Sequence, residues 1–170
     1  MGCGEGELVT ETPFAEMLRF NEWANRTLFD ACRALDDAQL DERAAGISAS
    51  VRELLTHIAT GQQTIVVRMA GGQQPSWAAW PGFDALEEAL SSSGDELMTR
   101  AEALEANSTV EVRRGEAAYL VPESFFLVLA LAHGVEHRTE IKIALNAIGV
   151  STPDLDSWAY GEARGFKRAV

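Results

Sequence analysis

The sequence is poor in basic residues and has no long hydrophobic run. Its 14 Lys and Arg side chains stand against 26 Asp and Glu, for a formal net charge of −12. No basic patch can offset phosphate repulsion on that background, so we expect neither nucleic acid nor an anionic membrane as a partner. The longest uninterrupted apolar run, residues 125–132, is far shorter than the roughly 18 residues that span a bilayer.

Cysteine is also scarce. Cys3 and Cys32 provide no disulfide framework, which excludes the class of small domains held together by disulfides. The first residues, MGCGEGELV, lack the basic segment and apolar run of a secretory signal, so we expect a cytoplasmic protein. Residues 1–11 are rich in Gly and Glu with little to bury, which predicts a disordered segment before a single domain over residues 12–170.

Hydrophobic periodicity predicts four amphipathic helices, over residues 13–35, 51–70, 85–104 and 122–149. The start signals are a Thr12-Pro13 pair, a capping box formed by Ser50 and Glu53, and Asp84 as a cap for the third helix. Residues 91–94, Ser-Ser-Ser-Gly, are weak helix formers, so we expect a bend or a break there.

A change of pattern precedes the last helix. Val110 and Val112 alternate with polar residues, and Gly115 lies in a predicted turn, which indicates a short hairpin. The expected fold class is therefore all-α, a four-helix bundle with a short hairpin before the last long helix.

The chain contains only three histidines, and all three fall on predicted inward faces. His133 and His137 are four residues apart, so they lie on one side of a helix and can reach the same ion. His57 lies on the predicted core side of the second helix. The pattern predicts a three-histidine site for a divalent metal, with Zn, Ni, Fe and Mn all left open by affinity order alone.

Several polar residues lie near the predicted site. Glu140 is placed to orient an imidazole or to handle a proton, and Glu136 lies farther round the helix; both can equally be solvated surface acids. Asn21 and Asn25 share the inner side of the first helix, where each either bonds a neighbouring helix or lines a pocket.

Four aromatic residues are candidate pocket walls. Trp77 and Trp80 lie in the loop of residues 71–83, which is either a lid or a cover for the end of the bundle. Trp158 and Tyr160 belong to a short predicted helical segment near the C-terminus. Residues 125–132 are apolar nearly all round their helix, for which a homodimer contact is one explanation.

Four segments carry a resemblance to the DinB/YfiT-like metalloenzyme family. They read FNEWANRTL (residues 20–28), SVRELLTHI (50–58), HGVEHRTEI (133–141) and DLDSWAY (154–160). The resemblance implies a four-helix bundle in which His57, His133 and His137 hold a divalent metal. Many relatives read HRGQ where this chain has HRTE, which leaves the three histidines intact. Characterised relatives include transferases and isomerases that use low-molecular-weight thiols such as bacillithiol or mycothiol.

Three functional readings follow. The leading one is a metal-dependent S-transferase that acts on a small-molecule substrate, with a low-molecular-weight thiol as cosubstrate. The second is a hydrolase that uses metal-bound hydroxide; HGVEH fits the H-x-x-E-H protease pattern with Glu136 as base, although the chain is short for that class. The third is a non-catalytic metal-binding dimer.

Overall fold

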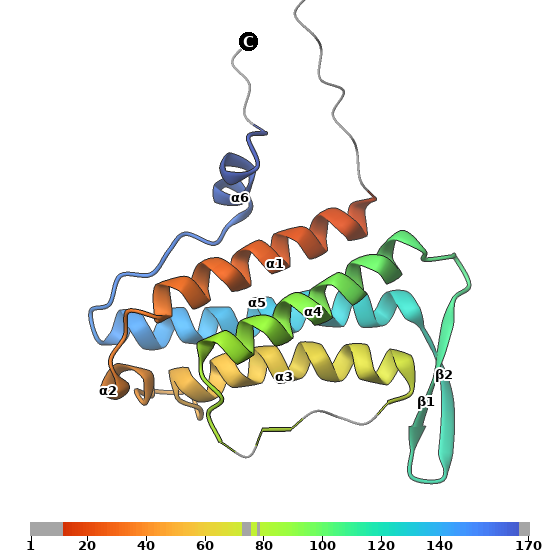
Figure 1. The fold of residues 1–170 in the computed structure, drawn as a ribbon, viewed down its shortest axis with the longest axis horizontal. Helices are drawn as coiled ribbons and strands as arrows, with labels where there is room; N and C mark the ends of the chain where they lie inside the picture. Colours follow the sequence, from red (N-terminus) through yellow and green to blue (C-terminus); the bar gives the residue numbers. More distant parts are fainter. Residues whose placement is uncertain (1–11, 73–75, 78, 167–170) are drawn as a thin grey trace, which may run out of the picture.

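The computed structural model describes residues 12–72, 76–77 and 79–166, and this part of the chain is mostly helical (Figure 1). It contains six helices and one two-stranded sheet: α1 (Pro13–Cys32), α2 (Asp37–Leu40), α3 (Val51–Ala70), α4 (Phe83–Glu102), β1 (Thr109–Arg114), β2 (Ala117–Pro122), α5 (Glu123–Ala147) and α6 (Ser157–Ala163). The four long predicted helices and the hairpin are confirmed. The segment expected to be disordered, residues 1–11, lies outside the described residues.

Helix ends follow the local chemistry of the sequence. The Thr12 hydroxyl accepts a hydrogen bond from the N–H of Ala15, which caps α1. At the start of α3, the Ser50 hydroxyl accepts from the N–H of Glu53, and the Glu53 carboxylate accepts from the N–H of Ser50 at 2.7 Å. The predicted capping box is therefore present. Gly71 ends the helix with φ 75°, a conformation that glycine adopts without strain.

Helix α4 departs from the prediction in two ways. Gly82 is its N-cap and makes no side-chain cap, while Asp84 accepts instead from Arg33 at 2.8 Å. The expected bend at residues 91–94 is absent, and the helix runs unbroken to Glu102. The Ser93 hydroxyl donates to the carbonyl of Ala89 one turn earlier and accepts from Gln62, so a tertiary contact supports this weak stretch.

The four long helices enclose two apolar clusters. The first is built around Leu28, Leu55, Leu86 and Leu145, and the second around Leu18, Ile65, Leu97 and Leu127. On every long helix the buried polar residues occur between the members of the two clusters. We call this set the polar layer; it comprises Asn21, Asn25, Gln62, Ser93 and Arg138.

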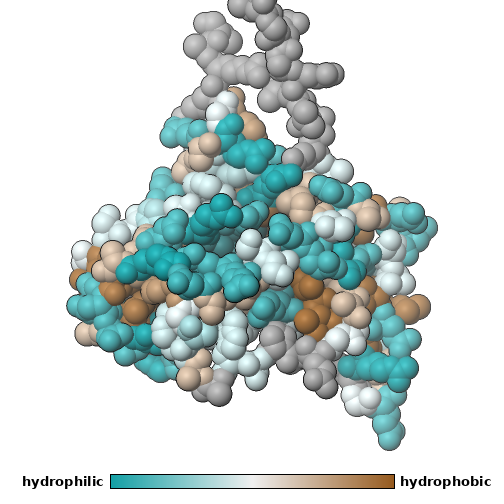
Figure 2. Space-filling view, viewed as in Figure 1, coloured by the Kyte–Doolittle hydropathy of each residue, from teal (hydrophilic) through white to brown (hydrophobic). Residues whose placement is uncertain are grey.

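The hairpin and the last helix are attached to this body at its margins. Strands β1 and β2 pair antiparallel from Thr109 with Pro122 to Arg114 with Ala117, and project beyond the helices (Figure 1). The face in Figure 2 is largely hydrophilic, with a hydrophobic area near the end that carries the hairpin. Helix α6 packs on α1. In the described part of the chain no helix has the length and apolar character needed to cross a membrane.

Replacing the cap of α3 tests the local origin of this helix. We expect Ser50→Ala to lower the free energy of unfolding by about 1 kcal/mol, because it leaves an N–H of the first turn without its acceptor. Urea denaturation gives the value. Ser92→Ala, on the exposed side of α4, is the control and should be neutral or slightly stabilising. Equal effects of the two substitutions would contradict the assignment.

Candidate metal centre

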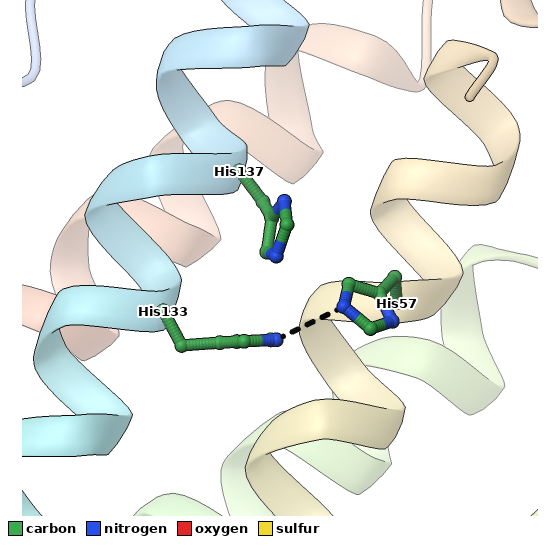
Figure 3. A group of neighbouring side chains, drawn as sticks. All are labelled: His57, His133 and His137. Atoms are coloured by element: carbon green, nitrogen blue, oxygen red, sulfur yellow. Dashed lines mark hydrogen bonds between the residues drawn. The ribbon is translucent and has the colours of Figure 1, made fainter. Parts of the chain in front are cut away.

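Three histidines converge where α3 packs against α5. His57 comes from α3, while His133 and His137 come from successive turns of α5 (Figure 3). The Nε2 atoms of His133 and His57 are 3.2 Å apart. One nitrogen from each of the three rings lies within 4.8 Å of the others. The predicted histidines are therefore gathered into a cluster that could hold a metal ion.

The separation of the His133 and His57 nitrogens fits a divalent ion. Metal–nitrogen bonds of about 2.0–2.1 Å in a tetrahedral arrangement place two ligand nitrogens about 3.3 Å apart. The 3.2 Å between His133 and His57 matches that value. Without an ion, the same distance serves a hydrogen bond in which one imidazole donates and the other accepts, so this separation is compatible with both states.

A carboxylate holds the third imidazole. His137 Nδ1 lies 2.7 Å from Glu140 Oε2, so its Nε2 is left for the cluster. In many metal sites a carboxylate bonds the outer nitrogen of a metal-binding histidine in this way, which orients the ring and fixes its tautomer. Glu136 is exposed and makes no such contact, but its charge acts on His57.

The cluster lies nearer the surface than the sequence indicated. His57 is exposed, and His133 and His137 are half-buried. The spacing predicts that α5 buries both histidines. The buried residues at this level are instead Gly134 and Arg138, each of which follows one of the histidines in the chain. Hydrophobic periodicity correctly places Phe126, Ala130, Ile141 and Ala144 on the buried face, but it misses Gly134 and Arg138 because their residue types are not typical of a core.

The surroundings keep two of the imidazoles neutral. Burial, together with the nearby His137 and His57, lowers the pKa of His133 to about 4. Burial and the neighbouring His137 also lower the pKa of His57, against the opposing effect of Glu140 and Glu136. Neutral imidazole is the form that binds a metal ion, so the cluster is ready to do so at neutral pH.

A glycine on α3 makes room for one of the rings. A Cβ placed on Gly61 would lie 2.1 Å from Cε1 and 2.5 Å from Nε2 of His133, far inside any allowed contact. From its spacing Gly61 is predicted only to lie on the buried side of this helix, with no part in the site. The available signal was a glycine in the interior of a predicted helix, where it costs about 1 kcal/mol relative to alanine and needs a reason.

An open cavity of about 890 Å³ adjoins the cluster. His57 and His133 line it together with Trp77 and Trp80, while Thr56, Thr60, Arg52, Arg68 and Leu129 complete much of its wall. The Trp80 ring also stacks with the Arg52 guanidinium, 5.2 Å from the ring centre. Two of the four predicted aromatic residues thus line the same cavity as the histidines.

The other two aromatic residues lie elsewhere. Tyr160 is buried against α1, where it contacts Phe20 and Trp23 and donates a hydrogen bond to Glu16. Trp158 is 73% exposed on α6, on the opposite side of the molecule from α3 (Figure 1). Neither belongs to the wall of the cavity beside the histidines.

The two asparagines are buried and turned away from the cluster. Both accept hydrogen bonds from the guanidinium of Arg138, so they bond across to α5. This is one of the two outcomes that the sequence left open for Asn21 and Asn25.

Comparison with known proteins gives a family and a fold. The DinB family profile matches residues 8–167. A DinB family structure from Exiguobacterium sibiricum aligns with 20% identity and TM-score 0.61, over 86% of this chain and all of its own. DinB-like proteins from Bacillus cereus and Bacillus subtilis each align over 83% of this chain and over 94% and 98% of their own, with 15% identity and TM-scores of 0.62 and 0.58. No curated protein matches the sequence.

Filling the space at Gly61 tests the geometry of the cluster. We expect Gly61→Ala to weaken binding of Zn²⁺ about 10-fold or more, as when groups that orient metal ligands are removed, because the new methyl group displaces the His133 ring. Competition with a chromophoric chelator measures the affinity. Gly94→Ala is the matched control: its nearest neighbour is 3.8 Å away, so it should keep the affinity and gain up to about 1 kcal/mol of stability.

The low pKa of His133 predicts a dependence of stability on pH in chelator-treated protein. As the pH falls through about 6.5, the unfolded chain takes up a proton at this residue while the folded protein does not until about 4. The free energy of unfolding should therefore fall over that interval, and it should fall less in His133→Gln. Urea midpoints compared at about pH 7 and about pH 5 decide this; parallel losses in both proteins would contradict it.

Proposed function

Because the chain belongs to the DinB family, we propose that it is a metal-dependent S-transferase that joins a low-molecular-weight thiol to an electrophilic small molecule. In this proposal α1, α3, α4 and α5 form a four-helix bundle within one domain, and His57, His133 and His137 hold a divalent ion. The thiol is of the bacillithiol or mycothiol type. The ion is Zn, Ni, Fe or Mn, each of which binds three imidazole nitrogens.

One observation supports a reactive site above a structural one. His57 and His133 belong both to the histidine cluster and to the wall of the open cavity, so a molecule in the cavity reaches the cluster directly. Closed structural sites typically have four protein ligands rich in cysteine, and the cysteine in the described residues, Cys32, is fully buried in the first apolar cluster.

The bound ion and the residues around it have separate roles in this proposal. When bound, a divalent ion supplies a Lewis acid that lowers the pKa of a thiol or water coordinated to it. Glu140 holds His137 in the orientation that points Nε2 at the cluster. Trp77 and Trp80 supply aromatic surface in the wall of the open cavity, against which an apolar part of a substrate would pack.

S-transfer needs a proton acceptor. The thiol loses its proton, the sulfur forms a bond to the electrophilic carbon, and the leaving group departs with the bonding electrons. Glu136 is the carboxylate we assign to that proton, because it is exposed on α5 immediately before His137 and its charge acts on His57. In a hydrolase the same carboxylate would serve as base toward water, and the two reactions differ in whether thiol is consumed.

A homodimer contact is part of the proposal. Phe125, Val128, Val135 and Ile143 are between 45% and 52% exposed on α5. Apolar side chains repeated along one exposed helix face are typical of an interface, and a second copy of the chain would bury them.

Metal analysis and a transfer assay test the proposal in sequence. We expect about one divalent ion per chain in the wild type and a large loss of it in His137→Ala, since only two ligands then remain. Asn146→Ala, exposed on the same helix, is the control and should keep the ion. Turnover is then measured with bacillithiol, mycothiol or N-acetylcysteine and 1-chloro-2,4-dinitrobenzene.

We expect thiol conjugation that requires the ion and disappears in His137→Ala. Wild-type protein that contains no metal would remove the enzyme proposal altogether. Metal-loaded protein that conjugates no thiol but hydrolyses esters would replace the transferase with the hydrolase. Metal-loaded protein that is inert in both assays and loses stability on chelation would indicate a structural site.

A further inference from the structure

Arg138 is the only charged side chain among the buried residues that the structure describes, with 3% of its surface exposed. It directly follows His137 in α5 but points to the other side of the helix, toward α1. Burying a guanidinium is costly unless its donors are satisfied, so its position needs an explanation.

The partners of Arg138 are neutral amides. Its Nη1 donates to Oδ1 of Asn21 at 2.7 Å and to Oδ1 of Asn25. The guanidinium also lies 6.0 Å from the centre of the Phe20 ring. The charge is therefore held by dipoles and an aromatic ring from α1, and no described carboxylate pairs with it. Burial lowers the pKa of Arg138 to about 10, which leaves it protonated at neutral pH.

The contact extends through the polar layer to the remaining long helices. Asn21 Nδ2 donates to Gln62 Oε1 of α3 at 3.3 Å. Gln62 Nε2 in turn donates to the Leu90 carbonyl and the Ser93 hydroxyl of α4, at 3.0 and 2.9 Å. Arg138 thus terminates a hydrogen-bonded chain that links α5 to α1, α3 and α4.

Two glycines allow close contacts of α5 with α1 and α3 at the level of the polar layer. A Cβ on Gly134 would lie 2.4 Å from Asn21 Oδ1 and 2.6 Å from Arg138 Nη1, so the missing side chain of Gly134 leaves the space in which Arg138 and Asn21 meet. On its other side, the His133 ring occupies the space above Gly61 of α3. The rotation of α5 about its axis is therefore constrained from both sides next to the two histidines.

The tolerance of a metal site makes this rotation important. An imidazole nitrogen lies well outside the helix backbone radius of about 2.3 Å, so turning the helix by about 20° moves it by roughly 2 Å. Metal–ligand distances tolerate only about 0.2 Å. Apolar packing alone leaves a helix face free to adjust by more than that, whereas directional hydrogen bonds do not.

We propose that Arg138 is a positioning residue for the candidate metal centre: by bonding Asn21 and Asn25 it sets the rotation of α5 at which His133 and His137 face His57. The inference rests on the proposed metal site and deepens it. A purely structural role would be served as well by an apolar side chain, because replacing buried charged groups with apolar ones of similar size is often neutral or stabilising.

The test compares two substitutions in α5 that differ in their relation to the polar layer. Arg138→Met removes the donors to Asn21 and Asn25, and Leu145→Ala creates a cavity in the first apolar cluster, away from the histidines. Each variant is titrated with Co²⁺, its visible d–d absorption spectrum is recorded, and its unfolding in urea is measured without metal.

We expect Arg138→Met to bind Co²⁺ at least 10-fold more weakly, with shifted d–d bands, whatever its stability. Leu145→Ala should lose stability but keep both the affinity and the spectrum. Arg138→Lys retains a charged donor and should recover part of the affinity. Should Arg138→Met fail to fold, Asn25→Ala removes one acceptor alone and is judged by the same two readouts.

Unchanged affinity and spectrum in Arg138→Met, or losses in both variants that follow their stability, would overturn the positioning role while leaving the metal site in place. Wild-type protein that binds no Co²⁺ would overturn the proposed function, and this inference with it.

Discussion

The close packing of α3 against α5 is the contact on which the candidate metal centre depends. It is possible because Gly61 presents no side chain where the His133 ring lies. His57 and His133 then approach to 3.2 Å, and His137 joins them from the next turn. Bringing imidazoles out of water lowers the pKa of His57 and His133, so the packing that assembles the ligands also keeps two of them neutral.

Apolar and polar contacts occupy different levels of the helices. The apolar clusters lie on either side of the polar layer and supply most of the burial that favours folding. The middle level contains glycine, amides and a buried guanidinium, which contribute less hydrophobic free energy but make directional contacts. His133 and His137 lie on the same stretch of α5 as Gly134 and Arg138, so the polar layer meets that stretch on the side away from the histidine cluster. An open cavity adjoins the histidines.

Much of the fold was predictable because its signals are local. The cap at Thr12, the capping box at Ser50 and Glu53, and the alternation before Gly115 act within a few residues, so the helices and the hairpin follow from the sequence. The errors arose where a distant segment decided the outcome. The weak stretch of α4 stays helical because Gln62 of α3 bonds to Ser93, and α5 buries Arg138 because two asparagines of α1 receive it.

By itself the sequence determined the number and approximate limits of the long helices, the acidic charge and the identity of the three histidines, since these depend on residue type and spacing along one chain. Only the tertiary structure decided that α5 buries Gly134 and Arg138 instead of the two histidines, and that Gly61 makes room for the His133 ring. It also decided that Trp77 and Trp80 line the cavity of the histidines while Trp158 and Tyr160 do not. Those outcomes depend on how two helices rotate against each other, and that rotation is set by pairwise contacts between residues far apart in the chain.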